Sequence, residues 1–136
     1  MIWSSPLYRG SISGSFKNAL DWLILLGERD PPYLADKVIG LISVAGGTQG
    51  LQAINTMEFI VRALRGWAVP LVVPIPQSWK AFEDSGRPAN PQIEEPLKTL
   101  GGEVTRVAGR LAQKDVTDPG AACAEAAARV ALVASE

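Results

Sequence analysis

The chain has 136 residues, 47% of them hydrophobic and 20% charged, a balance typical of one globular domain and not of a disordered segment. Thirteen basic and 14 acidic residues give a net charge of −1, which argues against general nucleic-acid binding because that function needs a basic face. Histidine is absent and Cys123 is the single cysteine, so an intrachain disulfide, a Ser-His or Cys-His nucleophile pair and a His-ligated zinc site are excluded. If the protein is an enzyme, we therefore expect a cofactor to carry the chemistry.

The sequence also lacks the patterns of membrane and secreted proteins. No apolar run reaches the ~20 residues needed to span a bilayer. No basic amphipathic helix is available for a membrane surface, and the first residues do not resemble a secretory signal. We therefore expect a cytoplasmic protein that binds neither membrane nor nucleic acid.

The first elements in the chain are a short strand, a loop and a helix. Residues 1–5 are typical of the end of a buried strand, and residues 6–11 of a loop. The spacing of the next apolar residues predicts a helix over about 13–26, with Ser13 as its N-cap and Gly27 as its stop. The apolar positions of that helix are Phe16, Ala19, Leu20 and Leu23.

Two more strands alternate with two more helices. Residues 38–44 are almost continuously apolar, as in a parallel strand covered on both faces, and a glycine-rich loop follows at 45–50. We predict a helix over about 51–65, ended by Gly66. The next strand, 69–75, contains two prolines that cannot donate ladder hydrogen bonds, which predicts an edge strand.

The remainder reads as a surface loop, a long helix and a tail. Residues 76–91 are polar and predict a long loop, and an apolar stripe predicts a helix over about 92–113. The alternation of strands and helices predicts an α/β fold with a parallel sheet. We expect one domain over residues 1–113 and an alanine-rich tail over 114–136.

Two loops are candidates for a ligand site. In open α/β sheets, ligands bind beyond the carboxyl ends of the strands, where Ser5–Ser11 and Ser43–Gly50 are expected. Glycine and short hydroxyl residues allow the close backbone approach that a flat aromatic ring needs. Either loop alone is more often an ordinary turn, and residues 46–50 are neither a dinucleotide fingerprint nor a Walker loop. The two loops in this order of elements favour a site.

A family resemblance is carried by residues 4–22, which run Ser-Ser-Pro-Leu-Tyr-Arg-Gly-Ser into a helix that contains Lys-Asn-x-x-Asp-Trp. This segment resembles the second flavin-binding loop of the NADPH-dependent FMN reductase family, and residues 43–48 resemble its third flavin-contacting loop. The resemblance extends over residues 1 to about 112. It implies a flavodoxin-like three-layer sandwich with strand order 2-1-3-4-5, of which this chain contains about three strands.

The resemblance also implies the ligand residues. FMN would be held by the two loops, and NADPH or NADH would be the co-substrate, with no catalytic side chain. Leu7 and Arg9 stand where the family has an acidic residue and an asparagine, which weakens the case for tight flavin binding more than the case for family membership. The predicted cofactor-binding residues are Ser5, Pro6, Leu7, Tyr8, Arg9, Gly10, Ser11, Ser43, Ala45, Gly46, Gly47 and Thr48.

Several residues keep two interpretations. Arg9 attracts a nucleotide phosphate or is a solvated loop charge, and Tyr8 lies near the flavin or caps the core. Trp22 is expected in packing, within the core or across a dimer, and Trp67 and Trp79 as packing or loop anchors. By analogy with the family, the 13–26 helix implies a homodimer or homotetramer.

The family pattern includes an N-terminal strand-helix-strand-helix unit whose loop holds the FMN phosphate at a helix N-terminus. Residues 1–136 contain no equivalent. We therefore expect either a longer working protein, which we favour, or a true short form that pairs with itself or another chain. The functional hypothesis is an NAD(P)H-dependent FMN oxidoreductase that passes electrons to a quinone, azo compound, metal or free flavin. The alternative is a non-catalytic flavodoxin-like remnant that acts through protein–protein contact.

Overall fold

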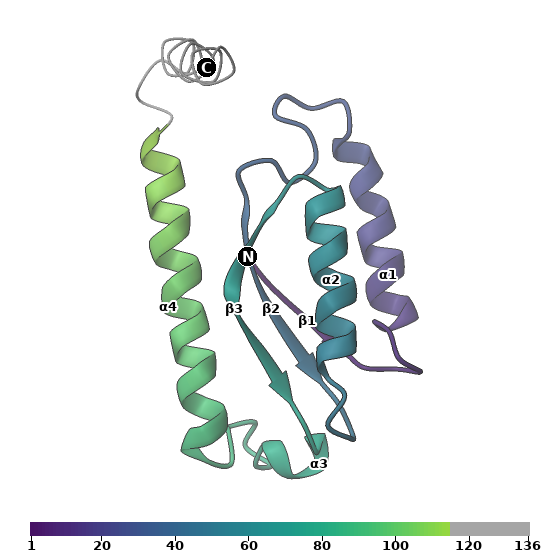
Figure 1. The fold of residues 1–136 in the computed structure, drawn as a ribbon, viewed down its shortest axis with the longest axis vertical. Coiled ribbons are helices and arrows are strands. Elements are labelled where there is room, and N and C mark those ends of the chain that lie inside the picture. The colour runs from purple at the N-terminus through teal and green to yellow at the C-terminus, as the bar shows by residue number, and fades with distance from the viewer. Residues whose placement is uncertain (115–136) are drawn as a thin grey trace, which may run out of the picture.

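Three parallel strands, in the order β1-β2-β3, form the centre of the computed structural model, which describes residues 1–114 (Figure 1). The strands are β1 (Ile2–Pro6), β2 (Val38–Val44) and β3 (Trp67–Ile75). The predicted α/β fold with a parallel sheet is therefore confirmed. The observed order is the one expected for the third, fourth and fifth strands of the 2-1-3-4-5 arrangement.

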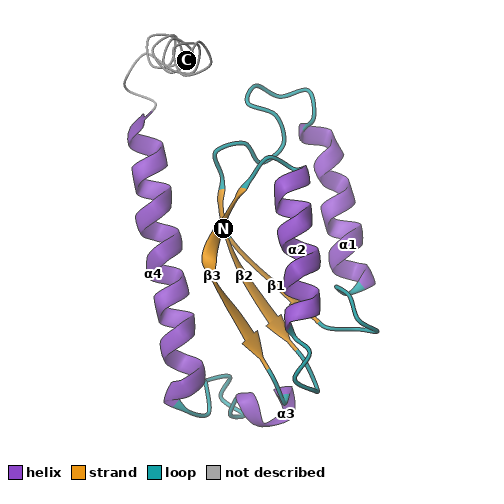
Figure 2. Ribbon diagram, in the orientation of Figure 1, coloured by secondary structure: helices purple, strands orange, loops and turns teal. Residues whose placement is uncertain are grey.

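Helices cover the sheet on two sides. Figure 2 shows α1 (Gly14–Asp21) and α2 (Leu51–Ala63) on one side and α4 (Pro91–Lys114) on the other. Two apolar clusters fill the spaces between these layers. The first joins β1 and β2 to α1 and α2, and the second joins β2 and β3 to α4. The result is a three-layer arrangement with the sheet in the middle.

The central strand β2 is apolar because it is buried on both faces. Ile39 and Leu41 are completely buried in the α1–α2 layer, and Val38 is buried in the α4 layer. Burying each such side chain contributes about 1.5–3 kcal/mol. Gly40 lets α4 approach the strand, because a Cβ at this position would lie 2.8 Å from Val104 Cγ2. A near-continuous apolar run is what a strand covered on both faces requires.

The predicted edge position of the third strand is confirmed. Among the described residues, β3 pairs only with β2. Ala45 N donates to Ile75 O at 2.9 Å, so the peptide groups of Ile75 point toward β2, and those of the neighbouring Pro74 point toward the open edge. Pro70 lies in an irregular stretch, where Ile39 pairs with Ala68 but Leu41 already pairs with Val72. Neither proline therefore interrupts a regular ladder.

The first predicted helix is correct at its start and at its stop, since Gly27 is the C-cap of the helical segment, but its last turns differ in type. Ser13 caps α1 as predicted, since its hydroxyl accepts from Phe16 N at 3.2 Å. The α-helix ends at Asp21, and a 3₁₀ helix, η1 (Trp22–Leu26), replaces the predicted final turns. Tightening to a 3₁₀ turn is a common way to satisfy the last carbonyls of a helix, and Gly27 N donates to Ile24 O there.

The end of α2 also differs from the prediction. The helix closes with a Schellman motif, in which Gly66 N donates to Val61 O and Arg65 N donates to Arg62 O. The left-handed residue is Arg65, with φ of 64°, and not the glycine. Gly66 is needed for a different reason, because a Cβ there would lie 2.5 Å from Ile39 Cδ1.

The segment predicted as a continuous loop contains a short helix, α3 (Ser78–Ala81). Ala81 of this helix is buried in the apolar cluster on the α4 side of the sheet. The alanine-rich tail beyond Lys114, including Cys123, lies outside the described residues. Within residues 1–114, no helix is long and apolar enough to cross a membrane.

Candidate functional site

The loops that follow β1 and β2 lie side by side at the carboxyl edge of the sheet. Leu7 N donates to Val44 O at 2.9 Å, which continues the ladder into the first loop. A Cβ on Gly10 would lie 3.5 Å from Gln52 Oε1, so the first loop also reaches the start of α2. The two predicted loops thus share one edge of the molecule.

The first loop is a tight two-residue turn. Tyr8 N donates to Ser11 O, and Ser11 N donates to Tyr8 O, at 2.9 and 3.1 Å. Arg9 and Gly10 both have positive φ, 52° and 84°, as a type I′ turn requires. The turn leaves the side chains of Tyr8 and Arg9 exposed to solvent. Pro6 and Leu7 are half-buried and connect the turn to β1.

Two of the predicted residues, Ser5 and Ser43, are partners across β1 and β2 and are completely buried. Ser5 Oγ accepts from Ser13 N at 3.1 Å and donates to Pro6 O. Ser43 Oγ donates to Gly50 O at 2.7 Å. Each hydroxyl therefore joins its strand end to the start of the helix that follows. In this structure these hydroxyls shape the two loops and face no solvent.

The second loop exposes backbone rather than large side chains. Gly46, Gly47 and Thr48 are exposed, and a Cβ on Gly47 would meet no atom within 4 Å. Ala45 is buried, and Gly50 is packed so closely that a Cβ there would lie 2.7 Å from Ser43 Oγ. The loop is thus fixed at both ends and open between them. A flat ring can approach such a backbone closely.

A third loop, which the sequence analysis did not single out, reaches the same edge. Ser78 N donates to Ala45 O at 3.1 Å and so joins α3 to the second loop. Trp79 lies on α3, and its Cζ3 is 3.5 Å from the Cβ that Gly46 lacks. The indole is 66% exposed. A helix this short has no periodic pattern, so only the tertiary structure reveals its position.

Arg9 after β1 and Lys80 on α3 are exposed cations at this edge, and the exposed acids Glu83 and Asp84 follow α3 in the chain. Within the described residues, no group of His, Cys, Asp or Glu side chains is placed to hold a metal ion. Every buried side-chain polar atom there has a hydrogen-bond partner. The edge thus offers backbone groups, aromatic rings and positive charge.

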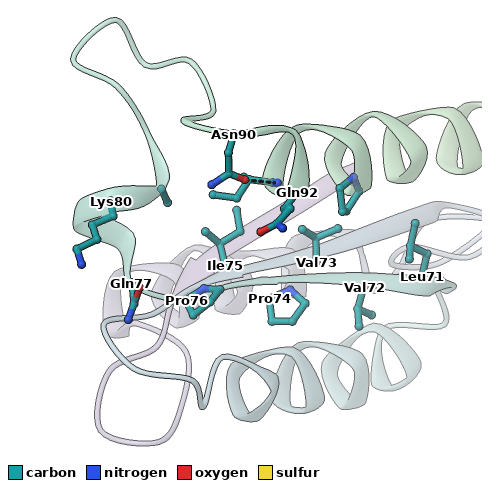
Figure 3. A pocket seen from close by; sticks show the side chains of 13 residues that line it. Leu71, Val72, Val73, Pro74, Ile75, Pro76, Gln77, Lys80, Asn90 and Gln92 are labelled. Carbon is teal, nitrogen blue, oxygen red and sulfur yellow. Dashed lines mark hydrogen bonds between the residues drawn. The ribbon is translucent and has the colours of Figure 1, made fainter.

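A cavity among the described residues lies beside the open edge of β3 and shares α3 with the candidate edge. Its volume is about 510 Å³, and Figure 3 shows its walls from β3, α3 and the start of α4. Most of its lining is apolar, and its polar groups include Gln77, Lys80 and Gln92. None of the twelve predicted cofactor-binding residues lines it. The predicted residues therefore lie on loops at the edge of the sheet and outside this cavity.

The family model and the similar known proteins point to the same family. The pattern that defines the family "NADPH-dependent FMN reductase" matches residues 1–80. NADPH-dependent FMN reductase ArsH of Acidithiobacillus ferrooxidans is 34% identical over 86 residues, which are 63% of this chain and 36% of that protein. FMN-dependent NADPH-azoreductase of Staphylococcus aureus is 36% identical over 86 residues, 63% of this chain and 43% of that protein.

A plant protein and a solved structure are also similar. Probable NADPH:quinone oxidoreductase 2 of Oryza sativa subsp. japonica is 31% identical over 102 residues, 73% of this chain and 48% of that protein. The crystal structure of Fusobacterium nucleatum flavodoxin bound to flavin mononucleotide superposes with a TM-score of 0.43 at 18% identity, over 80% of this chain and 70% of that one. The chain spans less than half the length of these three curated relatives.

Proposed function

Because the chain belongs to the NADPH-dependent FMN reductase family, we propose that it is the flavin-ring-binding part of an NAD(P)H-dependent FMN oxidoreductase. The observation that carries this proposal is the family match over residues 1–80, which spans both loops at the carboxyl edge. We propose residues 1–113 as the reductase domain and residues 114–136 as a separate tail.

The residues at the edge fit the ring of FMN. Gly46 and Gly47 let the ring approach the backbone, whose N–H groups are donors for the ring's carbonyls and nitrogens. Tyr8 supplies an exposed aromatic surface in the neighbouring loop, and Arg9 supplies positive charge for the phosphates of a nucleotide. Ser5 and Ser43 hold the loops in this form through their buried hydroxyls.

The family resemblance assigns the phosphate to a Ser/Arg-rich loop at a helix N-terminus within an N-terminal unit that precedes the segment matched by residues 4–22. In this chain the loop that contains Arg9 and Ser11 and leads into α1 is the one proposed for the ring. Since the chain spans less than half of its curated relatives, we propose that the complete activity belongs to a longer protein or to an assembly.

When bound, FMN would supply the redox chemistry, accepting a hydride from NADPH or NADH and reducing a quinone, azo compound, metal or free flavin. The chain's own part is to orient the ring, admit the nicotinamide at the open edge and offer positive charge through Arg9. No side-chain acid or base is needed for these steps. A cytoplasmic location is also part of the proposal and is tested by cell fractionation.

The test is FMN titration into the purified 136-residue chain, followed by flavin fluorescence. NADPH oxidation is then assayed with a quinone and with an azo dye. Saturable micromolar binding would support the proposal for this chain. A folded chain that neither binds FMN nor oxidises NADPH would refute it, and the same assays on a longer reading frame would then locate the activity.

We also propose a homodimer or homotetramer formed through α1 and η1. Trp22, Ile24 and Leu25 are 65–70% exposed on this segment, an unusual concentration of apolar surface. Leu25→Glu is expected to lower the molecular mass measured by light scattering to that of a monomer, whereas Phe59→Glu, at a 76% exposed apolar residue of α2, serves as the matched control. An unchanged mass for Leu25→Glu would refute this interface.

The non-catalytic alternative is favoured by one observation. Among the described residues, β1 pairs only with β2, and Ile2 of this strand is 49% exposed. An unpaired strand edge is a template for another chain. A chain that fails to bind FMN but forms a stable hetero-complex would favour this alternative.

A further inference from the structure

Trp79 is held in place by the structure, yet its side chain is left in solvent. The helix that carries it, α3, is fixed by the bond from Ser78 N to Ala45 O and by the buried side chain of Ala81. Gln77, with φ of 50°, makes the bend that starts the helix. The indole nevertheless remains 66% exposed. A packing role alone does not account for a large apolar ring that is mostly uncovered on an anchored helix.

The ring touches the second loop of the candidate site. Trp79 Cζ3 lies 3.5 Å from the position of a Cβ on Gly46, so one edge of the indole rests against that glycine. The exposed residues Gly47 and Thr48 follow Gly46 directly in the chain. A planar ligand that covers this backbone therefore meets the indole at its side.

The other tryptophans of the chain do not share this position. Trp3 is buried and makes an edge-to-face contact with Phe16 at 5.8 Å between ring centroids. Trp22 lies on η1, in the helical layer on one side of the sheet. Trp67 is 57% exposed but begins β3, at the amino end of the sheet. Trp67 is therefore a matched control of similar exposure, at the end of β3 opposite to the one that α3 follows.

We propose that Trp79 is a flavin-ring-binding residue, whose indole forms a wall beside Gly46 and contacts the bound isoalloxazine ring. This inference rests on the proposed function, because it assumes that a flavin ring binds over residues 46–48. It goes beyond that proposal by assigning binding to the loop after β3. Aromatic stacking contributes little per contact, and its loss weakens binding roughly 3- to 10-fold.

The experiment titrates FMN, and separately lumiflavin, into the unaltered chain and into the Trp79→Ala, Trp79→Phe and Trp67→Ala variants. Lumiflavin has the ring without the phosphate, so it reports ring contacts alone. Circular dichroism and size exclusion establish that each variant is folded and in the same oligomeric state. Two signals are followed, the dissociation constant and the fluorescence yield of the bound flavin, which an indole in contact with the ring quenches.

We expect Trp79→Ala to weaken the binding of both ligands about 3- to 10-fold and to raise the fluorescence yield of bound flavin. Trp79→Phe should recover most of the affinity and not the quenching, and Trp67→Ala should match the unaltered chain. Equal affinity and equal quenching in Trp79→Ala would overturn the inference and leave the proposed function intact. A change in oligomeric state without a change in flavin binding would also overturn it, because Trp79 would then serve a protein contact. Absence of binding by the folded unaltered chain would overturn the proposed function and this inference with it.

Discussion

Gly50, at the start of α2, is a position where one added methyl group is expected to destabilise the fold. A Cβ there would lie 2.7 Å from Ser43 Oγ and 3.2 Å from Pro74 Cβ. It would also press on the buried hydrogen bond from Ser43 Oγ to Gly50 O. Gly50→Ala is therefore expected to lower the free energy of unfolding.

The magnitude follows from three effects. Overpacking costs about 1–3 kcal/mol, and loss of a buried hydrogen bond costs about 1 kcal/mol. Alanine lowers the entropy of the unfolded chain and offsets about 0.5 kcal/mol, since the Gly50 backbone, at φ −53° and ψ −28°, suits alanine. We expect a net loss of about 1.5–3.5 kcal/mol. Gly47→Ala, where a Cβ meets nothing, should change stability by less than about 0.5–1 kcal/mol.

Urea unfolding followed by circular dichroism measures these changes, and Ser43→Ala completes a double-mutant cycle. Ser43→Ala alone removes the hydrogen bond and costs about 1 kcal/mol. In that background the hydroxyl that the new methyl group at position 50 would strike is gone. The double variant should therefore lose at least about 1 kcal/mol less than the two single losses combined. Additivity within about 0.5 kcal/mol would refute the clash argument.

Three further outcomes are expected. Gly10→Ala places a side chain at φ 84° and should lower the free energy of unfolding by about 1–2 kcal/mol; an unchanged melting temperature would mean that the turn has another conformation. Leu100→Ala empties a completely buried position under α4 and should cost about 2–5 kcal/mol, whereas the exposed Thr99→Ala should cost far less; equal losses would contradict the packing of α4. The Glu94 carboxylate, by hydrogen bond and charge, raises the pKa of Lys98, so the ion pair's contribution is present below the ordinary lysine pKa and lost as pH rises through the raised value. Glu94→Gln should return the Lys98 pKa toward the ordinary value in an NMR titration, and an unmoved pKa would contradict this assignment.

The sequence by itself determined the layers of the fold and the edge where a ligand is expected. The apolar run of residues 38–44 predicted a strand covered on both faces, and the prolines of β3 predicted an edge strand. These signals are local, because periodicity and a missing N–H depend only on the residues themselves. The pairing of two loops at one edge followed from parallel strand geometry.

Only the tertiary structure decided which groups at that edge are exposed. Ser5 and Ser43 were predicted to contact a cofactor, and the structure shows both hydroxyls buried and bonded to backbone. Trp79 was predicted as a packing or loop anchor, and its indole is exposed beside Gly46. The exposure of a side chain depends on which segments, far apart in the chain, pack around it. The contact of α3 with the second loop joins Ser78 to Ala45, a separation that periodicity in the sequence does not report. The end of α2 likewise depends on Ile39 filling the space behind Gly66, a contact between residues far apart in the chain.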